Sequence, residues 1–150
     1  MSLKNAASEH HPRIADRLVA ARRGRFVGRL AELELFRTAL LAAEPPFVVL
    51  HIYGPGGIGK IALLREYARM AAEGSRPVVC LDRRNVDPSP PGFLLALRQT
   101  IGLEGGDLAT TVRDWPPSGV LLIDTYETFA ALDAWLRETF LPQLPGKAWW

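Results

Sequence analysis

The chain has 150 residues, of which 48% are hydrophobic and 23% are charged, and these proportions fit one globular domain with a substantial core. Its net charge of +2, from 18 basic and 16 acidic residues, is too balanced to argue for nucleic-acid binding. Cys80 is the single cysteine, which excludes an internal disulfide and fits a reducing cytoplasm, and the sequence shows neither a secretory signal nor an apolar run of the about 18 residues that cross a membrane.

The N-terminal part of the chain is polar and then basic. Residues 1–11 are expected to form a tail, and a short helix is predicted from Pro12 to about Arg23, with its apolar residues on one face. Its arginines could contact nucleic acid, but a solvated flank or linker is the simpler interpretation, because no recognition motif accompanies them. We therefore expect residues 1–24 to be a tail and a short basic helix.

Two apolar elements follow. Leucines and Phe36 recur at helical spacing over residues 29–43, which predicts an amphipathic helix that Pro45 and Pro46 end. The next segment, 47–53, is apolar at almost every position. This pattern predicts a strand that is buried on both faces, as in a parallel sheet.

The segment from Gly54 to Lys60 has the Gly-x-x-x-x-Gly-Lys spacing of a phosphate-binding P-loop, the Walker A pattern. Its glycines allow positive φ angles that bring several N–H groups around one anion, and the N-terminus of the helix predicted over 61–72, which Gly74 ends, adds a positive dipole. The alternative is a glycine-rich turn with a chance lysine, which the strand–loop–helix setting disfavours. The residues expected to hold a nucleotide here are Gly54, Pro55, Gly56, Gly57, Ile58, Gly59, Lys60, Ile61 and Ala62.

Ile61 breaks the P-loop pattern at one position. A serine or threonine normally follows the lysine, and its hydroxyl ligates Mg²⁺. Ile61 is β-branched like threonine, so the fold should tolerate it, but its side chain has no oxygen. The sequence therefore predicts a nucleotide site in which Mg²⁺ binding is weakened.

The rest of the chain alternates between strand-like and helix-like segments. The predicted elements are a strand at 77–82, a proline-rich loop at 85–92, helices at 93–101 and 108–112, a strand at 119–124 and a helix at 126–140. Strands that alternate with helices predict an α/β fold with a parallel sheet.

Asp124 ends the apolar run from Val120 to Ile123, which is the Walker B form. A parallel strand would deliver this carboxylate to the carboxyl edge of the sheet, where it could hold Mg²⁺. The alternative is that Asp124 or Thr125 caps the helix that follows. Glu127 could polarise an attacking water molecule, or it could belong to a capping box with the same two residues. The candidate catalytic residues are therefore Asp124 and Glu127, and the candidate metal ligand is Asp124.

A third motif lies about 25 residues before the loop, in the run Arg25-Phe26-Val27-Gly28-Arg29-Leu30-Ala31-Glu32-Leu33. Together with the two Walker motifs, it resembles the start of a STAND-type or AAA-like P-loop ATPase of the kind found in bacterial signalling regulators. The resemblance implies that Phe26, Val27, Gly28 and Arg29 help to hold the adenine base. It also implies a three-layer P-loop NTPase fold over residues 25–150.

Members of this family continue beyond the elements predicted here, with further strands, a sensor residue and a helical lid. Their fourth strand lies between the first and the third, so the resemblance implies a domain truncated after the Walker B strand and the next helix, with an open slot in its sheet. Residues 147–150 would then begin the missing strand. An arrangement with the first and third strands adjacent, as in nucleotide kinases, would leave no slot.

These observations lead us to expect an ATP- or ADP-binding module of a cytoplasmic regulatory ATPase. Its expected partners are the nucleotide and the missing lid and effector domains of a longer parent protein, with no membrane and no direct nucleic-acid contact. Ile61 and the truncation predict weak Mg²⁺ binding and slow or absent hydrolysis. Two alternatives stay open: an active ATPase or nucleotide-dependent kinase, and a degenerate interaction module that binds no nucleotide.

Overall fold

The computed structural model describes residues 28–47 and 49–145. The basic helix expected from Pro12 to about Arg23 lies outside these residues. Packing divides the chain into residues 1–30 and residues 31–150, and the fold described below is that of the second unit.

The sheet consists of two parallel strands, β1 (Val78–Asp82) and β2 (Val120–Asp124). Val78 is the register partner of Val120, and Asp82 is the partner of Asp124. Both strands were predicted from their apolar runs, each beginning one residue earlier, so these two predictions are confirmed. The parallel pairing between segments separated by helices confirms the α/β class.

The strand predicted at 47–53 is wrong. The described residues of this segment, 47 and 49–53, form no strand. Residues 49–53 line a cavity that β2 also lines, but among the described residues only β1 pairs with β2, so the described part of this segment does not form the adjacent order expected in a nucleotide kinase. The physical reason is that an apolar run becomes a strand only when a neighbouring strand pairs with its backbone.

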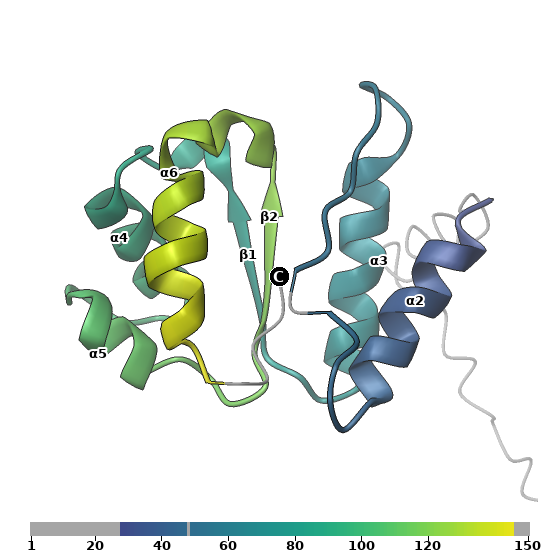
Figure 1. The fold of residues 1–150 in the computed structure, drawn as a ribbon, viewed down its shortest axis with the longest axis horizontal. Coiled ribbons are helices and arrows are strands. Elements are labelled where there is room, and N and C mark those ends of the chain that lie inside the picture. The colour runs from purple at the N-terminus through teal and green to yellow at the C-terminus, as the bar shows by residue number, and fades with distance from the viewer. Residues whose placement is uncertain (1–27, 48, 146–150) are drawn as a thin grey trace, which may run out of the picture. The chain divides into compact units, whose positions relative to one another are not determined.

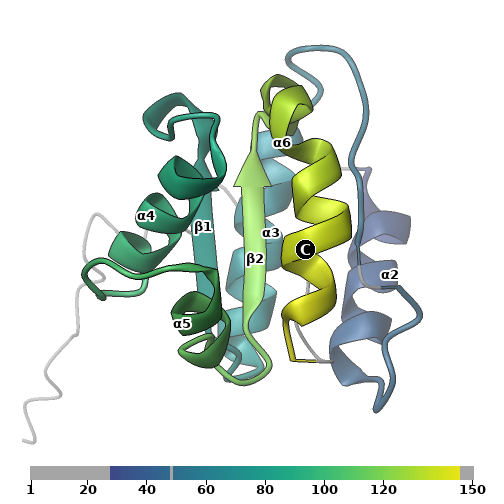
Figure 2. The same cartoon turned by 60° about the vertical axis from the view of Figure 1, so that its left-hand side comes forward.

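Helices α2 (Leu30–Leu41) and α3 (Lys60–Glu73) confirm two predicted helices, and Gly74 is the C-cap of α3 as expected. The Phe36 ring stacks on the Tyr67 ring with 4.1 Å between centroids, and the Tyr67 hydroxyl donates to the carbonyl oxygen of Glu32 over 3.1 Å. These contacts hold α2 against α3. In turn, α3 packs on both strands. It lies on the opposite side of them from α4 (Pro90–Thr100), α5 (Leu108–Arg113) and α6 (Ala130–Trp135) (Figure 1 and Figure 2).

Helix α4 (Pro90–Thr100) begins three residues earlier than predicted. Ser89 is its N-cap, and the Ser89 hydroxyl accepts a hydrogen bond from the Gly92 N–H over 3.2 Å. Pro90 then fits the first helical position because its missing N–H would have no intrahelical acceptor there. The proline-rich sequence that suggested a loop is therefore partly a helix start.

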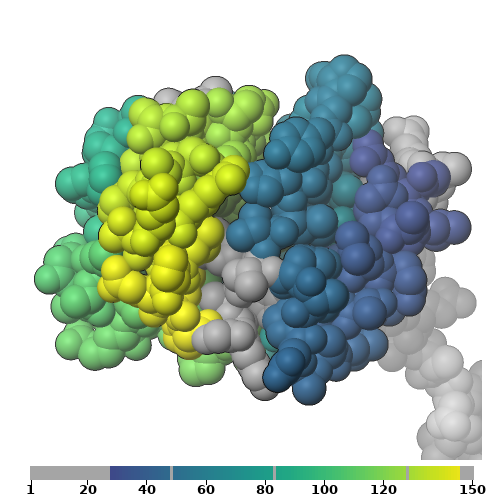
Figure 3. All heavy atoms as spheres, in the orientation of Figure 1, coloured from purple at the N-terminus to yellow at the C-terminus, as the bar shows by residue number. Residues whose placement is uncertain are grey.

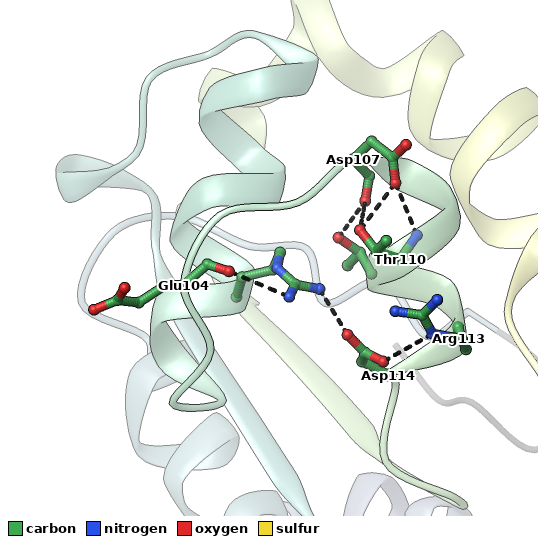
Figure 4. Close-up of polar contacts among 7 residues, drawn as sticks. Glu104, Asp107, Thr110, Arg113 and Asp114 are labelled. Carbon is green, nitrogen blue, oxygen red and sulfur yellow. Dashed lines mark hydrogen bonds and ion pairs between the residues drawn. The ribbon is translucent and has the colours of Figure 1, made fainter.

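Helix α5 (Leu108–Arg113) is the short helix predicted at 108–112, and Asp107 caps it by accepting from the Thr110 N–H over 2.9 Å. Arg98 of α4 is buried and pairs with Asp114, which follows α5, over 3.1 Å (Figure 4). This guanidinium also donates to the Glu104 carbonyl oxygen over 3.4 Å. The ion pair therefore ties the end of α5 to α4.

The helix predicted at 126–140 is a continuous helical path with changing hydrogen-bond patterns. It consists of the 3₁₀ turn η2 (Tyr126–Phe129), the α-helix α6 (Ala130–Trp135), the π-helical η3 (Leu136–Phe140) and the 3₁₀ turn η4 (Leu141–Gln143). Its residues Phe129, Leu132, Leu136 and Phe140 are all buried. Phe93 of α4 makes edge-on contacts with the rings of Phe129, Trp135 and Phe140, so an aromatic cluster joins this path to α4.

Across residues 28–47 and 49–145, no helix has both the length and the apolar character needed to cross a bilayer.

Candidate functional site

The loop before α3 has the backbone conformation that its glycines were expected to allow. Gly54, Gly57 and Gly59 have φ angles of 151°, 82° and 89°. Gly59 is the N-cap of α3 and provides no side-chain hydrogen bond to the first turn. The first intrahelical bond runs from the Leu63 N–H to the Gly59 carbonyl oxygen, so the N–H groups that begin α3 have no intrahelical acceptor.

The Ile58 side chain lies close to the position that a side chain on Gly54 would take. A Cβ atom on Gly54 would lie 2.0 Å from Cδ1 of Ile58. A side chain at position 54 would therefore require the Ile58 side chain to shift, in addition to the backbone strain at positive φ. Residues 53–59 are all exposed, and the loop projects from the molecular surface (Figure 3).

Lys60 turns its side chain back over the loop. Its Nζ donates to the carbonyl oxygens of Gly54, over 2.6 Å, and Pro55, over 3.3 Å. These two carbonyl oxygens are uncharged, whereas a phosphate oxygen carries negative charge and is a stronger acceptor for an ammonium group. The arrangement therefore places a cation and the uncapped N-terminus of α3 at one point, which suits an anion.

Ile61 and Ala62 lie in the first turn of α3, and the Ile61 side chain is 50% exposed. The position where a P-loop normally carries a hydroxyl therefore presents a methyl-bearing surface to solvent.

Asp124 and Glu127 lie with Lys60 around a cavity of about 740 Å³. Of the predicted loop residues, only Lys60 lines this cavity; the others lie outside its walls. The lysine of the loop and the two carboxylates predicted from the Walker B segment therefore line one cavity, whereas the loop glycines are exposed and do not line it.

Of the helix-capping alternatives, the structure has Thr125 at the N-cap position but forms neither an Asp124 cap nor a capping box. The N-cap of η2 is Thr125, and its side chain makes no capping hydrogen bond. Glu127 is the second residue of η2 and not the third, which a capping box requires. Thr125 also has a φ of 62°, a conformation that is uncommon for a β-branched residue. The backbone therefore turns sharply just after Asp124, and Asp124 is not used as a cap.

Sequence reasoning missed two further charged residues near Asp124. Asp82 ends β1 beside Asp124, and Arg84 forms a two-pronged pair with Asp82, with Nε–Oδ1 and Nη2–Oδ2 distances of 3.0 and 2.5 Å. Hydrogen bonds from Arg84 lower the pKa of Asp82, and the negative charges of Asp82 and Asp124 raise the pKa of Arg84. The signal was available, because both predicted strands end in aspartate and paired parallel strands end at one edge.

The side chains near the loop and the cavity offer few free oxygen ligands for Mg²⁺. Within residues 28–47 and 49–145, no three His, Cys, Asp or Glu side chains cluster in a way that could hold a metal ion. Asp82 is engaged by Arg84, and Ile61 offers no oxygen. Asp124 alone, near the charges of Lys60 and Arg84, does not fit the several oxygen ligands that Mg²⁺ requires.

A second polar group lies on another wall of the same cavity. The Tyr126 hydroxyl donates to Oδ1 of Asp133 over 2.5 Å, and Nε of Arg137 donates to the same oxygen over 3.0 Å. Burial, followed by the Asp133 carboxylate, raises the pKa of Tyr126 to about 12. The Tyr126 hydrogen bond lowers the pKa of Asp133, and the charges of Arg137 and His51 add to this effect.

Four residues were expected to hold the base, and the structure leaves this expectation untested. Phe26 and Val27 lie outside the described residues, and Gly28 and Arg29 belong to the first packing unit.

Comparison of the chain with known proteins found no matching protein-family model, no matching curated protein and no matching solved structure.

Proposed function

We propose that the chain binds ATP or ADP through the loop from Gly54 to Lys60. The observation that carries this proposal is the position of the Lys60 ammonium group, folded over positive-φ glycines at the uncapped N-terminus of α3. Helix N–H groups, the helix dipole and a lysine are together the elements that hold the phosphates in P-loop proteins. The finer P-loop NTPase fold and the kinship to STAND-type or AAA-like ATPases, including a base contact by residues 26–29, are parts of the same proposal.

In this proposal, nucleotide binding depends little on Mg²⁺. Ile61 withholds the hydroxyl ligand, and the carboxylate of Asp82 is already paired with Arg84. Lys60 supplies charge neutralisation at the phosphates. Glu127, which lines the same cavity as Lys60, would orient a water molecule. Hydrolysis would still be slow, because the charge that develops on the leaving group is poorly compensated. The chain is therefore a nucleotide-responsive regulatory module more than an efficient ATPase.

The test compares Lys60→Ala with Arg65→Ala by titration calorimetry of ATP and ADP. Both substitutions remove one positive charge from α3, but Arg65 is an exposed residue further along the helix. Lys60→Ala should raise the Kd for both nucleotides at least about tenfold, the scale of a lost charge-assisted hydrogen bond. Arg65→Ala should leave the Kd within about twofold.

If Lys60→Ala changes neither nucleotide affinity nor the Tm shift caused by saturating nucleotide, the loop does not bind phosphate. The degenerate interaction module would then be the better description.

A further inference from the structure

Large apolar side chains are exposed in and around the phosphate loop. Tyr53, directly before the loop, is 80% exposed, and Ile58 and Ile61 are 38% and 50% exposed. Single exposed apolar side chains are common on protein surfaces, but these three belong to one short segment of the chain. The loop therefore presents apolar side chains to solvent as well as its positive charge.

Tyr53 is the first ring of an aromatic row that continues with His51 and Tyr126. The Tyr53 ring is nearly parallel to the His51 ring, with 5.8 Å between centroids and 16° between the ring planes. The His51 ring meets the Tyr126 ring edge-on, with 5.3 Å between centroids, and Tyr126 is itself held by its hydrogen bond to Asp133. These contacts orient the Tyr53 ring, while its high exposure leaves most of its surface accessible.

The Tyr53 ring and the Lys60 ammonium group belong to the same part of the molecule. Nζ of Lys60 donates to the carbonyl oxygen of Gly54, which is the residue after Tyr53, over 2.6 Å. The Cα atoms of Tyr53 and Gly54 are about 3.8 Å apart, as in any trans peptide. Lys60 and the three rings of the aromatic row also line the same cavity. One small ligand can therefore reach both the cation and the row.

A ligand that uses both features needs an anionic group joined to a flat, apolar group. Inorganic phosphate would satisfy Lys60 and leave the ring exposed. A nucleotide carries phosphates together with a planar base, and every base has a face that stacks on an aromatic side chain. Because the Tyr53 ring is already oriented, stacking on it would cost little conformational entropy.

We propose that Tyr53, oriented by His51, stacks on the base of the nucleotide whose phosphates Lys60 holds. This inference rests on the proposed function, and it adds a contact to the one assigned there to residues 26–29. Stacking uses a surface that all bases share, so Tyr53 contributes affinity for the base with little preference among bases.

The test is titration calorimetry of the full chain with ATP and with inorganic tripolyphosphate, both without Mg²⁺. Tripolyphosphate has the phosphates of ATP without its base, so it reports on the loop alone. Tyr53→Ala should raise the Kd for ATP at least about fivefold, the lower end of what stacking of one base contributes, and should leave the Kd for tripolyphosphate within about twofold. Tyr53→Phe keeps the ring and should retain the ATP affinity within about twofold.

Proton NMR of bound ATP provides a direct readout of stacking. The adenine H2 and H8 signals should move upfield on binding to the native chain and to Tyr53→Phe, and this shift should be lost in Tyr53→Ala. The Tm of each variant checks folding, which the exposed position of Tyr53 should leave intact.

Unchanged ATP affinity in Tyr53→Ala would overturn the inference and leave the proposed function standing, because the base would then be held elsewhere. Equal weakening of ATP and tripolyphosphate would also overturn it, since Tyr53 would then act on the loop and not on the base. A native chain that binds neither ligand would contradict the proposed function itself, and the stacking contact with it.

Discussion

Gly54 is the loop residue whose lack of a side chain has the clearest steric reason. Its φ of 151° strains any residue that has a Cβ atom, and the tip of the Ile58 side chain would also have to move. Gly56, two residues later, has no atom within 4 Å of the place where its Cβ would lie, and its φ is not in the positive range. Alanine substitutions at these two glycines therefore distinguish the effect of a changed loop conformation from the effect of merely losing a glycine.

We expect Gly54→Ala to weaken ATP binding at least about tenfold, while Gly56→Ala changes the affinity less than threefold, because only the first substitution displaces the loop. Titration calorimetry of both variants measures this difference, with Tm values as a control for folding. Equal affinities of the two variants would mean that the shape of the loop at Gly54 does not matter for the ligand.

Tyr126 and Asp133 make a residue-scale prediction about pH. The pKa of Asp133 lies below its ordinary value of 3.8, first because Tyr126 donates to it. Such a carboxylate stabilises the fold above its unfolded-state pKa, and this contribution is lost as the pH falls through its folded-state pKa. The raised pKa of Tyr126, about 12, has its effect at alkaline pH. The stability that the protonated hydroxyl contributes to the fold is lost as the pH rises from 10 towards 12.

In Tyr126→Phe, the pKa of Asp133 should therefore rise towards 3.8, and acid unfolding should begin at a higher pH than in the native chain. Carboxyl NMR of Asp133 and an acid titration followed by circular dichroism measure the two effects. Tyr53→Phe is the matched control, because Tyr53 lines the same cavity but is 80% exposed. An unchanged Asp133 pKa in Tyr126→Phe would contradict the assigned hydrogen bond.

At the scale of elements, α4 connects the strand pair to the aromatic cluster. Leu97 of α4 is 0% exposed and belongs to the core, whereas Leu95 of the same helix is 49% exposed. Leu97→Ala should lower the free energy of unfolding by about 2–5 kcal/mol through lost burial and a residual cavity. Leu95→Ala should change it by less than about 0.5 kcal/mol. Urea unfolding of the two variants tests whether α4 packs as described, and similar losses in both would contradict it.

Helix boundaries illustrate what sequence patterns resolve at this scale. The periodicity of α2 and α3 located both helices within two residues at each end, because their apolar faces pack on neighbouring elements. The start of α4 was predicted too late, since a proline after a serine can begin a helix as well as prevent one. The changes to 3₁₀ and π geometry over 126–143 leave no trace in the periodicity, because the same residues remain buried.

At the scale of the whole molecule, the sequence did not predict which distant segments pair as strands. The apolar runs at 77–82 and 119–124 became strands because they pair with each other, while the described residues of the equally apolar run at 47–53 form no strand. The loop glycines, Lys60, Asp124 and Glu127 could be predicted from local motifs. Asp82 and Arg84 were missed, because the aspartate that ends each predicted strand locates them at the edge with Asp124 only once the two strands are known to be neighbours.

In our proposal, the phosphate-binding loop binds nucleotides with little contribution from Mg²⁺. The most direct measurement is calorimetry of ATP and ADP, with and without Mg²⁺, on the native chain and on Ile61→Thr. The native chain should bind both nucleotides with a Kd that Mg²⁺ changes less than about threefold, and Ile61→Thr should gain at least about tenfold in ATP affinity when Mg²⁺ is added, because the new hydroxyl supplies a ligand. Absence of binding by both proteins under both conditions would contradict the account.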